Sequence, residues 1–89
     1  MKGIITVLGK DKVGIIAKIC TYLAGNGINI LDINQTITGG YFNMMMIVDI
    51  SRAEGQFGRH VDALAALGNE IGVEARLQHE DIFNSMHRI

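Results

Sequence analysis

The hydrophobic pattern of this chain changes its period across the polar stretch Gly9–Gly14 (GKDKVG). Before this stretch, residues 4–8 are apolar and mostly β-branched, with a glycine on either side, which is typical of a strand. After it, apolar residues recur every three or four positions, which is typical of a helix. The sequence therefore predicts a strand that ends near Leu8, a turn through these six residues, and a helix from about Val13.

The same six residues allow two interpretations. Gly14 has no Cβ, so it can take an unusual backbone angle or let a ligand approach closely. Asp11 can accept hydrogen bonds from the free amides of the first helical turn. The stretch is therefore a local structural device, a binding site, or both.

Glycines and a capping signal divide the rest of the chain into further segments. Gly25-Asn26-Gly27 should end the first helix, Gly39-Gly40 is a tight hairpin signal, and the Ser51-Arg52-Ala53-Glu54 segment has the spacing of a capping box. The expected elements are a strand over 2–8, a helix over 13–24, strands over 28–38 and 41–50, a helix over 51–71 with Phe57, Val61, Leu64, Ala65 and Ile71 buried, and a strand over 73–80.

Two of the strands have informative patterns. The apolar phase of the second strand changes near Leu31-Asp32, which predicts a β-bulge there. The third strand is apolar on alternate residues from Phe42 to Ile50, and Tyr41, Met45 and Ile47 make its other face partly apolar. That second face is expected to contact something else, such as a second subunit.

This order of elements predicts an α+β, ferredoxin-like βαββαβ sandwich: a four-stranded antiparallel sheet with two helices on one face. The 89 residues form one domain, with residues 1–80 as its core and residues 81–89 as a short C-terminal amphipathic helix. If the first two strands lie in one sheet, Asn29 is expected next to the first loop.

The composition argues against several classes of partner. Eight basic and nine acidic residues give a net charge of −1, and the basic ones are dispersed, so neither nucleic acid nor an anionic membrane surface is expected. No uninterrupted apolar run approaches the roughly 18 residues of a membrane span. A cytoplasmic protein is expected, and a chain this small would gain stability from self-association.

Metal and catalytic chemistry are also not predicted. The first loop has no cysteine pair for a metal and no arginine for phosphoryl chemistry, and Gly14 is not followed by the lysine and hydroxyl of a phosphate-binding loop. The three histidines lie on different expected elements, and Cys20 has no evident base. We expect no catalytic residue, no metal and no cofactor.

The segment from Gly9 to Ala17, together with Leu23, the Gly27–Ile30 turn and Asp32-Ile33, resembles the ACT domain, a small regulatory module of amino-acid metabolism. The whole chain is most similar to the stand-alone single-ACT-domain proteins of bacteria and archaea, including Gln35-Thr36, the methionine-rich third strand and the ending at residues 81–86.

This resemblance implies a homodimer that binds an amino acid or a similar small molecule at a subunit interface. It implies a binding site lined by the first loop and the start of the first helix, at Gly9, Lys10, Asp11, Val13, Gly14 and Ile15. We add Asn29 and Ile30 of the second strand to this site, with Ile30 as an apolar wall. Free amides at the helix start favour a carboxylate, Asp11 could accept an ammonium group, and Asn29 offers both a donor and an acceptor. The structural alternative is that Gly14 permits packing, Asp11 caps the helix and Asn29 closes a turn.

The sequence therefore favours a non-catalytic sensor that acts on a separate protein. A second hypothesis is a protein-interaction or structural module whose ACT-type pocket is unoccupied. A third and weaker one is a small enzyme that uses Lys10 or Lys12 on an anionic substrate.

Overall fold

The computed structural model describes residues 2–10 and 13–81, apart from the side chains of residues 52–54. Its elements are β1 (Lys2–Lys10), α1 (Ile15–Gly25), β2 (Asn29–Thr38), β3 (Tyr41–Asp49), the short 3-10 helix η1 (Ser51–Gln56), α2 (Phe57–Ile71) and β4 (Val73–His79). The expected C-terminal helix over residues 81–89 lies outside the described residues, except for Asp81.

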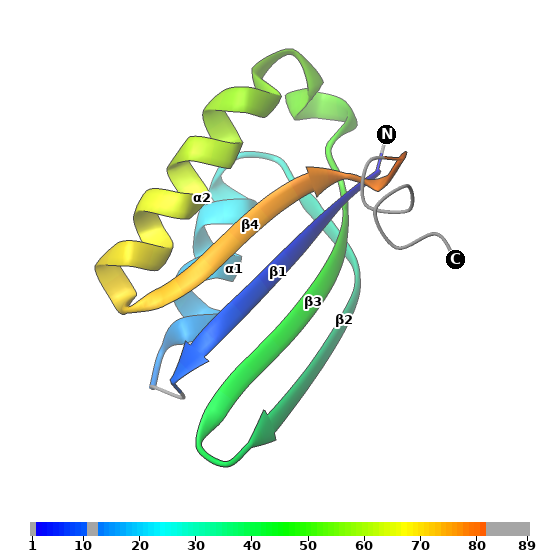
Figure 1. Ribbon diagram of the computed structural model, residues 1–89. Coiled ribbons are helices and arrows are strands. Elements are labelled where there is room, and N and C mark those ends of the chain that lie inside the picture. Colours follow the sequence, from blue (N-terminus) through cyan, green and yellow to red (C-terminus); the bar gives the residue numbers. More distant parts are fainter. Residues whose placement is uncertain (1, 11–12, 82–89) are drawn as a thin grey trace.

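The four strands form one antiparallel sheet in the order β2-β3-β1-β4. Both helices lie on one face of this sheet, and α1 is seen behind the strands in Figure 1. The predicted ferredoxin-like sandwich is confirmed. We call the face without helices the open face.

The core lies between the helices and the inner face of the sheet. On β3 it takes Phe42, Met44, Met46 and Val48, all at most 3% exposed, which are the alternate apolar residues expected there. From the helices it takes mainly Ile15, Ile19 and Leu23 of α1, and Leu64 and Ile71 of α2. Tyr41 and Met45 point to the open face and are exposed.

Two local predictions on the second strand are confirmed. The β2–β3 register shifts between Ile30 and Asp32, which places the bulge where the apolar phase changes. Gly39 and Gly40 have φ values of 59° and 83°, as a tight hairpin turn with two left-handed residues requires.

The first strand and helix differ from the prediction at their meeting point. β1 continues to Lys10 instead of ending near Leu8, because Gly9 and Lys10 pair with Phe42 and Tyr41 of β3. A Cβ on Gly9 would lie 2.8 Å from the Val73 Cγ1 atom, so this strand glycine is needed for packing. The helix starts at Ile15 rather than Val13.

The buried face of α2 also differs from the prediction. A helical turn does begin at Ser51, but it is the 3-10 helix η1, and α2 starts only at Phe57. Ala65 is exposed, while His60 and Gly68 are buried. The reason lies at Gly68, where a Cβ would stand 2.8 Å from the Val73 carbonyl oxygen: the helix presses its backbone against β4 there, and this fixes which side faces inward.

Candidate functional site

The first-loop half of the predicted site lies where β1 ends and α1 begins. Gly14 is the N-cap residue of α1, with φ of 90° and ψ of 0°. No described side chain caps this helix, and its first turn holds no acidic residue. Its amides can therefore attract an anion.

The structure distinguishes between the two interpretations of Gly14. A Cβ at this position would meet nothing within 4 Å, so the glycine is not required for helix packing. It is required by its positive φ, which other residues rarely adopt. Asp11, the expected capping or ligand residue, lies outside the described residues.

The side chains of this half are unequally available. Lys10 and Val13 are exposed, whereas Ile15 is only 2% exposed and belongs to the core. Ile15 therefore presents its backbone amide at this end of the molecule, and its side chain is committed to packing.

Asn29 and Ile30 lie at the opposite end of the sheet. Asn29 pairs with Asp49, which pairs with Lys2, whereas Lys10 pairs with Tyr41. The two halves are thus eight residue steps of β1 apart within one chain, roughly 27 Å at strand spacing. The expectation that Asn29 adjoins the first loop is wrong. Because α1 returns the chain to the other end of the sheet, β2 starts at the same end as β1, and β3 lies between these two strands.

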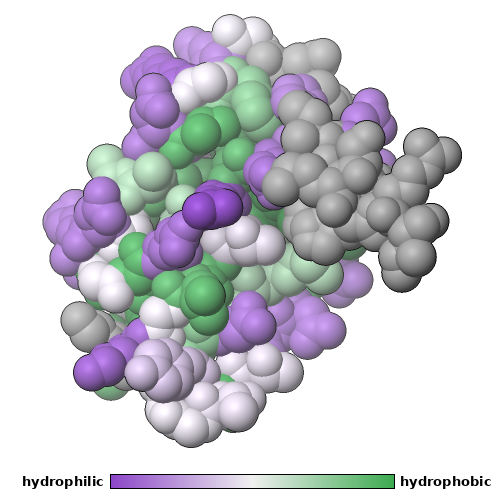
Figure 2. All heavy atoms as spheres, viewed as in Figure 1, coloured by the Kyte–Doolittle hydropathy of each residue, from purple (hydrophilic) through white to green (hydrophobic). Residues whose placement is uncertain are grey.

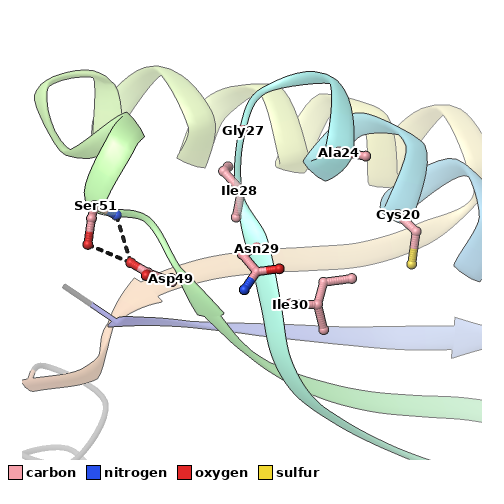
Figure 3. A pocket seen from close by; sticks show the side chains of 8 residues that line it. All are labelled: Cys20, Ala24, Gly27, Ile28, Asn29, Ile30, Asp49 and Ser51. Atoms are coloured by element: carbon pink, nitrogen blue, oxygen red, sulfur yellow. Dashed lines mark hydrogen bonds between the residues drawn. The ribbon is translucent and has the colours of Figure 1, made fainter.

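A groove of about 710 Å³ opens beside Asn29 at the β2 edge (Figure 3). Its walls come from α1, from the turn into β2, and from the end of β3. The lining residues are Cys20, Ala24, Gly27, Ile28, Asn29, Ile30, Asp49 and Ser51. Both apolar and polar groups therefore face a space of the size that small-molecule pockets occupy.

The polar side of the groove is ordered by hydrogen bonds. The Asp49 Oδ1 atom accepts from the Ser51 backbone amide at 3.0 Å and from the Ser51 hydroxyl at 2.5 Å (Figure 3). Sequence reasoning treated Ser51 only as a cap and missed Asp49 and Cys20 as lining residues. The pairing of Asn29 with Asp49 brings them together, and no local pattern announces it.

The β2 strand beside this groove is exposed along most of its length. Ile33 and Ile37 pair with Met46 and Phe42 and so share the inner face, yet they are 43% and 57% exposed. Neither helix covers them. β2 is also an edge strand, so one side of its backbone has no strand partner in the described chain.

One polar contact joins the two helices on the inner face. The Tyr22 hydroxyl lies 2.6 Å from the His60 Nδ1 atom, and the two rings meet edge to face with centroids 5.8 Å apart. Burial raises the pKa of the Tyr22 hydroxyl above its ordinary value of 10.0, and the nearby charge of Arg59 partly opposes this shift. His60 is 2% exposed.

Within residues 2–10 and 13–81, no three His, Cys, Asp or Glu side chains gather where they could hold a metal ion. In that same part of the chain, every helix is too short or too polar to cross a membrane.

Comparisons with known proteins agree on one family. The sequence profile of the ACT domain matches residues 3–78. A UPF0237 protein of Bifidobacterium longum is 59% identical over 88 residues, which cover 99% of this chain and 98% of that protein. A UPF0237 protein of Methanococcus maripaludis is 51% identical over 86 residues, covering 97% of this chain and 96% of the relative.

Solved structures give the same answer. An ACT domain protein from Streptococcus pneumoniae superimposes with a TM-score of 0.83 and 41% identity, covering 93% of each chain. The ligand-free regulatory subunit of aspartate kinase from Thermus thermophilus has a TM-score of 0.66 and 31% identity, covering 86% of this chain and 50% of that one. The chain therefore belongs to the ACT domain family, and within it to the UPF0237 proteins found in bacteria and archaea.

Proposed function

We propose that this protein is a non-catalytic regulatory module that binds an amino acid as a homodimer and acts on a separate protein. The observation that carries the proposal is the separation of the two halves of the site. The start of α1 and the Asn29 groove lie at opposite ends of one sheet, so a single chain cannot close one small ligand between them.

Edge pairing through β2 would bring the halves together. In an antiparallel β2–β2 pair, the start of one β2 lies beside the end of the other. Since Thr38 pairs with Tyr41 and Tyr41 with Lys10, the end of β2 is also the end of the sheet where α1 begins. Asn29 of the partner subunit would then lie about three strand spacings from Lys10, roughly 14 Å, instead of roughly 27 Å.

The surface of β2 supports this pairing. Its sequence, NILDINQTIT, contains no proline or lysine, and its one charge is Asp32 at the bulge. Prolines, lysines and other charged residues usually protect an edge strand from association. An edge of ten residues that exposes Leu31, Ile33 and Ile37 favours a partner strand.

In the resulting site, Gly9, Lys10, Asp11, Val13, Gly14 and Ile15 come from one protomer, and Asn29 and Ile30 come from its partner. The α1 amides and the Lys10 ammonium suit a carboxylate, and the groove beside Asn29 suits a side chain of moderate size. The likeness to an aspartate kinase regulatory subunit supports an amino acid as the ligand class.

The test is a thermal-shift screen of the twenty amino acids at millimolar concentration. At least one should raise the melting temperature of the wild type, and Lys10→Glu and Asn29→Leu should each abolish that shift. If no amino acid changes the melting temperature of an intact dimer, the pocket is unoccupied by this class and the alternative, an interaction module without a ligand, replaces the proposal.

A further inference from the structure

The open face of the sheet is unevenly exposed from one end to the other. Ile4 and Leu8 alternate with the core residues of β1, so both point to this face. β1 is paired on both sides along its length. Leu8 is 53% exposed, whereas Ile4 is only 6% exposed. Since the two residues have the same position within the sheet, the sheet alone does not account for the burial of Ile4.

The residues beside Ile4 follow the same gradient. Ile4 pairs with Ile47 of β3 and with Gln78 of β4, and both of these residues are partly buried. The partners of Leu8 on the same two strands are exposed. Figure 2 looks onto the strands and shows hydrophobic atoms set among hydrophilic ones. We call Gln78, Ile4 and Ile47 the shielded row.

The chain leaves the sheet at the end where the shielded row lies. β4 ends at His79, which pairs with Gly3, the residue before Ile4. Figure 1 shows the end of β4 beside the start of β1. The backbone becomes helical at Glu80 and Asp81. The residues that follow Asp81 therefore start next to the shielded row.

The sequence of this C-terminal segment suits an apolar surface. Residues 82–89, which lie outside the described part of the chain, have the sequence IFNSMHRI. Its apolar residues recur at the spacing of one side of a helix, and polar residues lie between them. They are Ile82, Phe83, Met86 and Ile89.

The length of the segment also matches the shielded row. Eight residues of α-helix are about 12 Å long. The row crosses from β4 over β1 to β3, which is two strand spacings or roughly 10 Å. Leu8 lies four residue steps beyond Ile4 along β1, roughly 13 Å away. A segment of this length that lies across the row therefore leaves Leu8 exposed.

We infer that residues 82–89 pack on the shielded row, with their apolar side against Ile4 and Ile47. The occupant is the C-terminal segment of the same chain, because the shielding begins where β4 ends and stops before Leu8 and Met45, which are 53% and 39% exposed. One end of the open face is then closed to other proteins, and the end with Leu8 and Met45 stays accessible. The inference does not depend on the proposed ligand site, which shares no residue with the shielded row.

Nuclear Overhauser contacts of the Ile4 methyl groups in the full chain test the inference directly. In a uniformly labelled sample, these methyl groups should contact protons of residues 82–89. An isotope-filtered spectrum of mixed labelled and unlabelled chains should lack these contacts, because they lie within one chain. Contacts that appear in the filtered spectrum, or no contact with residues 82–89 in the uniformly labelled sample, would overturn the inference.

Two matched variants of the segment measure what the packing contributes. Phe83→Asp/Met86→Asp places two carboxylates on the apolar side, and Asn84→Asp/His87→Asp places two at the same spacing on the polar side. The first variant should melt about 5 °C or more below the wild type, and the second within about 2 °C of it. Equal melting temperatures of the two variants would overturn the packing.

The two variants also separate this inference from the proposed function. Sedimentation should give both variants the mass of the wild type, because the contact is made within one chain. A loss of mass in Phe83→Asp/Met86→Asp alone would assign the segment to an interface between chains and overturn the inference. Both variants should keep the thermal shift produced by the amino acid found in the screen, so a failure here leaves the ligand site untouched.

Discussion

β2 and β4 are the two edges of one sheet, but only β4 is covered by a helix along its inner face. The inner residues Val73, Ala75 and Leu77 of β4 are 4–6% exposed beneath α2, whereas Ile33 and Ile37 of β2 are 43% and 57% exposed. The outward side of β4 carries Glu74 and Arg76; β2 carries one charge in ten residues. The chain completes one edge by itself and leaves the other suited to a partner.

The largest expected effect comes from charging the β2 edge. Ile33→Lys/Ile37→Lys should dissociate the proposed dimer, because each exchange removes about 1.5–3 kcal/mol of apolar burial at the interface. The dimer dissociation constant should rise at least 100-fold. Analytical ultracentrifugation measures it.

The matched change at the other edge is Glu74→Lys on β4. It removes one exposed ion pair, so the dimer dissociation constant should stay within about twofold of the wild type. If the β4 change dissociates the dimer and the β2 change does not, the roles assigned to the two edges are reversed.

A smaller effect is expected where α2 covers β4. Gly68→Ala places a Cβ 2.8 Å from the Val73 carbonyl oxygen and 3.0 Å from the Ala75 amide nitrogen. The helix must move away from the strand, so the free energy of unfolding should fall by about 1–3 kcal/mol in urea denaturation.

Gly58→Ala is the control for helix propensity, because nothing lies within 4 Å of its added Cβ. It should be neutral or raise the free energy of unfolding by up to about 1 kcal/mol. Equal destabilisation by both changes would argue against a close helix–strand contact at Gly68.

The smallest expected effect concerns the hydrogen-bonded contact between Tyr22 of α1 and His60 of α2. This contact links the helix beside the β2 edge to the helix that covers β4. Tyr22→Phe removes the hydroxyl that lies 2.6 Å from His60 Nδ1 and should cost about 1 kcal/mol of unfolding free energy at neutral pH.

Tyr22 should make the free energy of unfolding fall as the pH rises above 10. The folded-state pKa of Tyr22 is raised above 10.0, so the unfolded chain loses this proton first as the pH rises. In the wild type, the contribution of Tyr22 to the free energy of unfolding should be present below pH 10 and be lost as the pH rises above it. The free energy of unfolding of Tyr22→Phe should lack this additional decline. Parallel pH curves above pH 10 would show that Tyr22 does not titrate as described.

Local signals in the sequence were sufficient for the sheet. The phase change near Leu31 located the bulge, Gly39-Gly40 located the hairpin, and the alternation of apolar with polar residues over the expected strand 73–80 located β4. Each of these three features depends on residues that are neighbours in the chain. The hydrophobic period and the residues preferred in turns are therefore sufficient to predict it.

The buried face of α2 and the geometry of the site could not be predicted in this way. Gly68 was not among the residues expected to be buried, and only its distance to β4 shows that it is the contact point. Asn29 was expected beside the first loop on the condition that the first two strands lie in one sheet, and they do share the sheet without bringing Asn29 to the loop. Its true position depends on strand register, which no local residue encodes.

The central claim, a ligand site shared between two subunits, is tested most directly by mixing two defective variants. Calorimetry with the amino acid found by thermal shift should detect no sites in Lys10→Glu alone or in Asn29→Leu alone. A mixture that has exchanged subunits contains heterodimers in which one of the two sites is intact, so about one quarter of the wild-type sites should return. If subunit exchange is complete by mass spectrometry and no sites return, the two halves do not form one site and the account is contradicted.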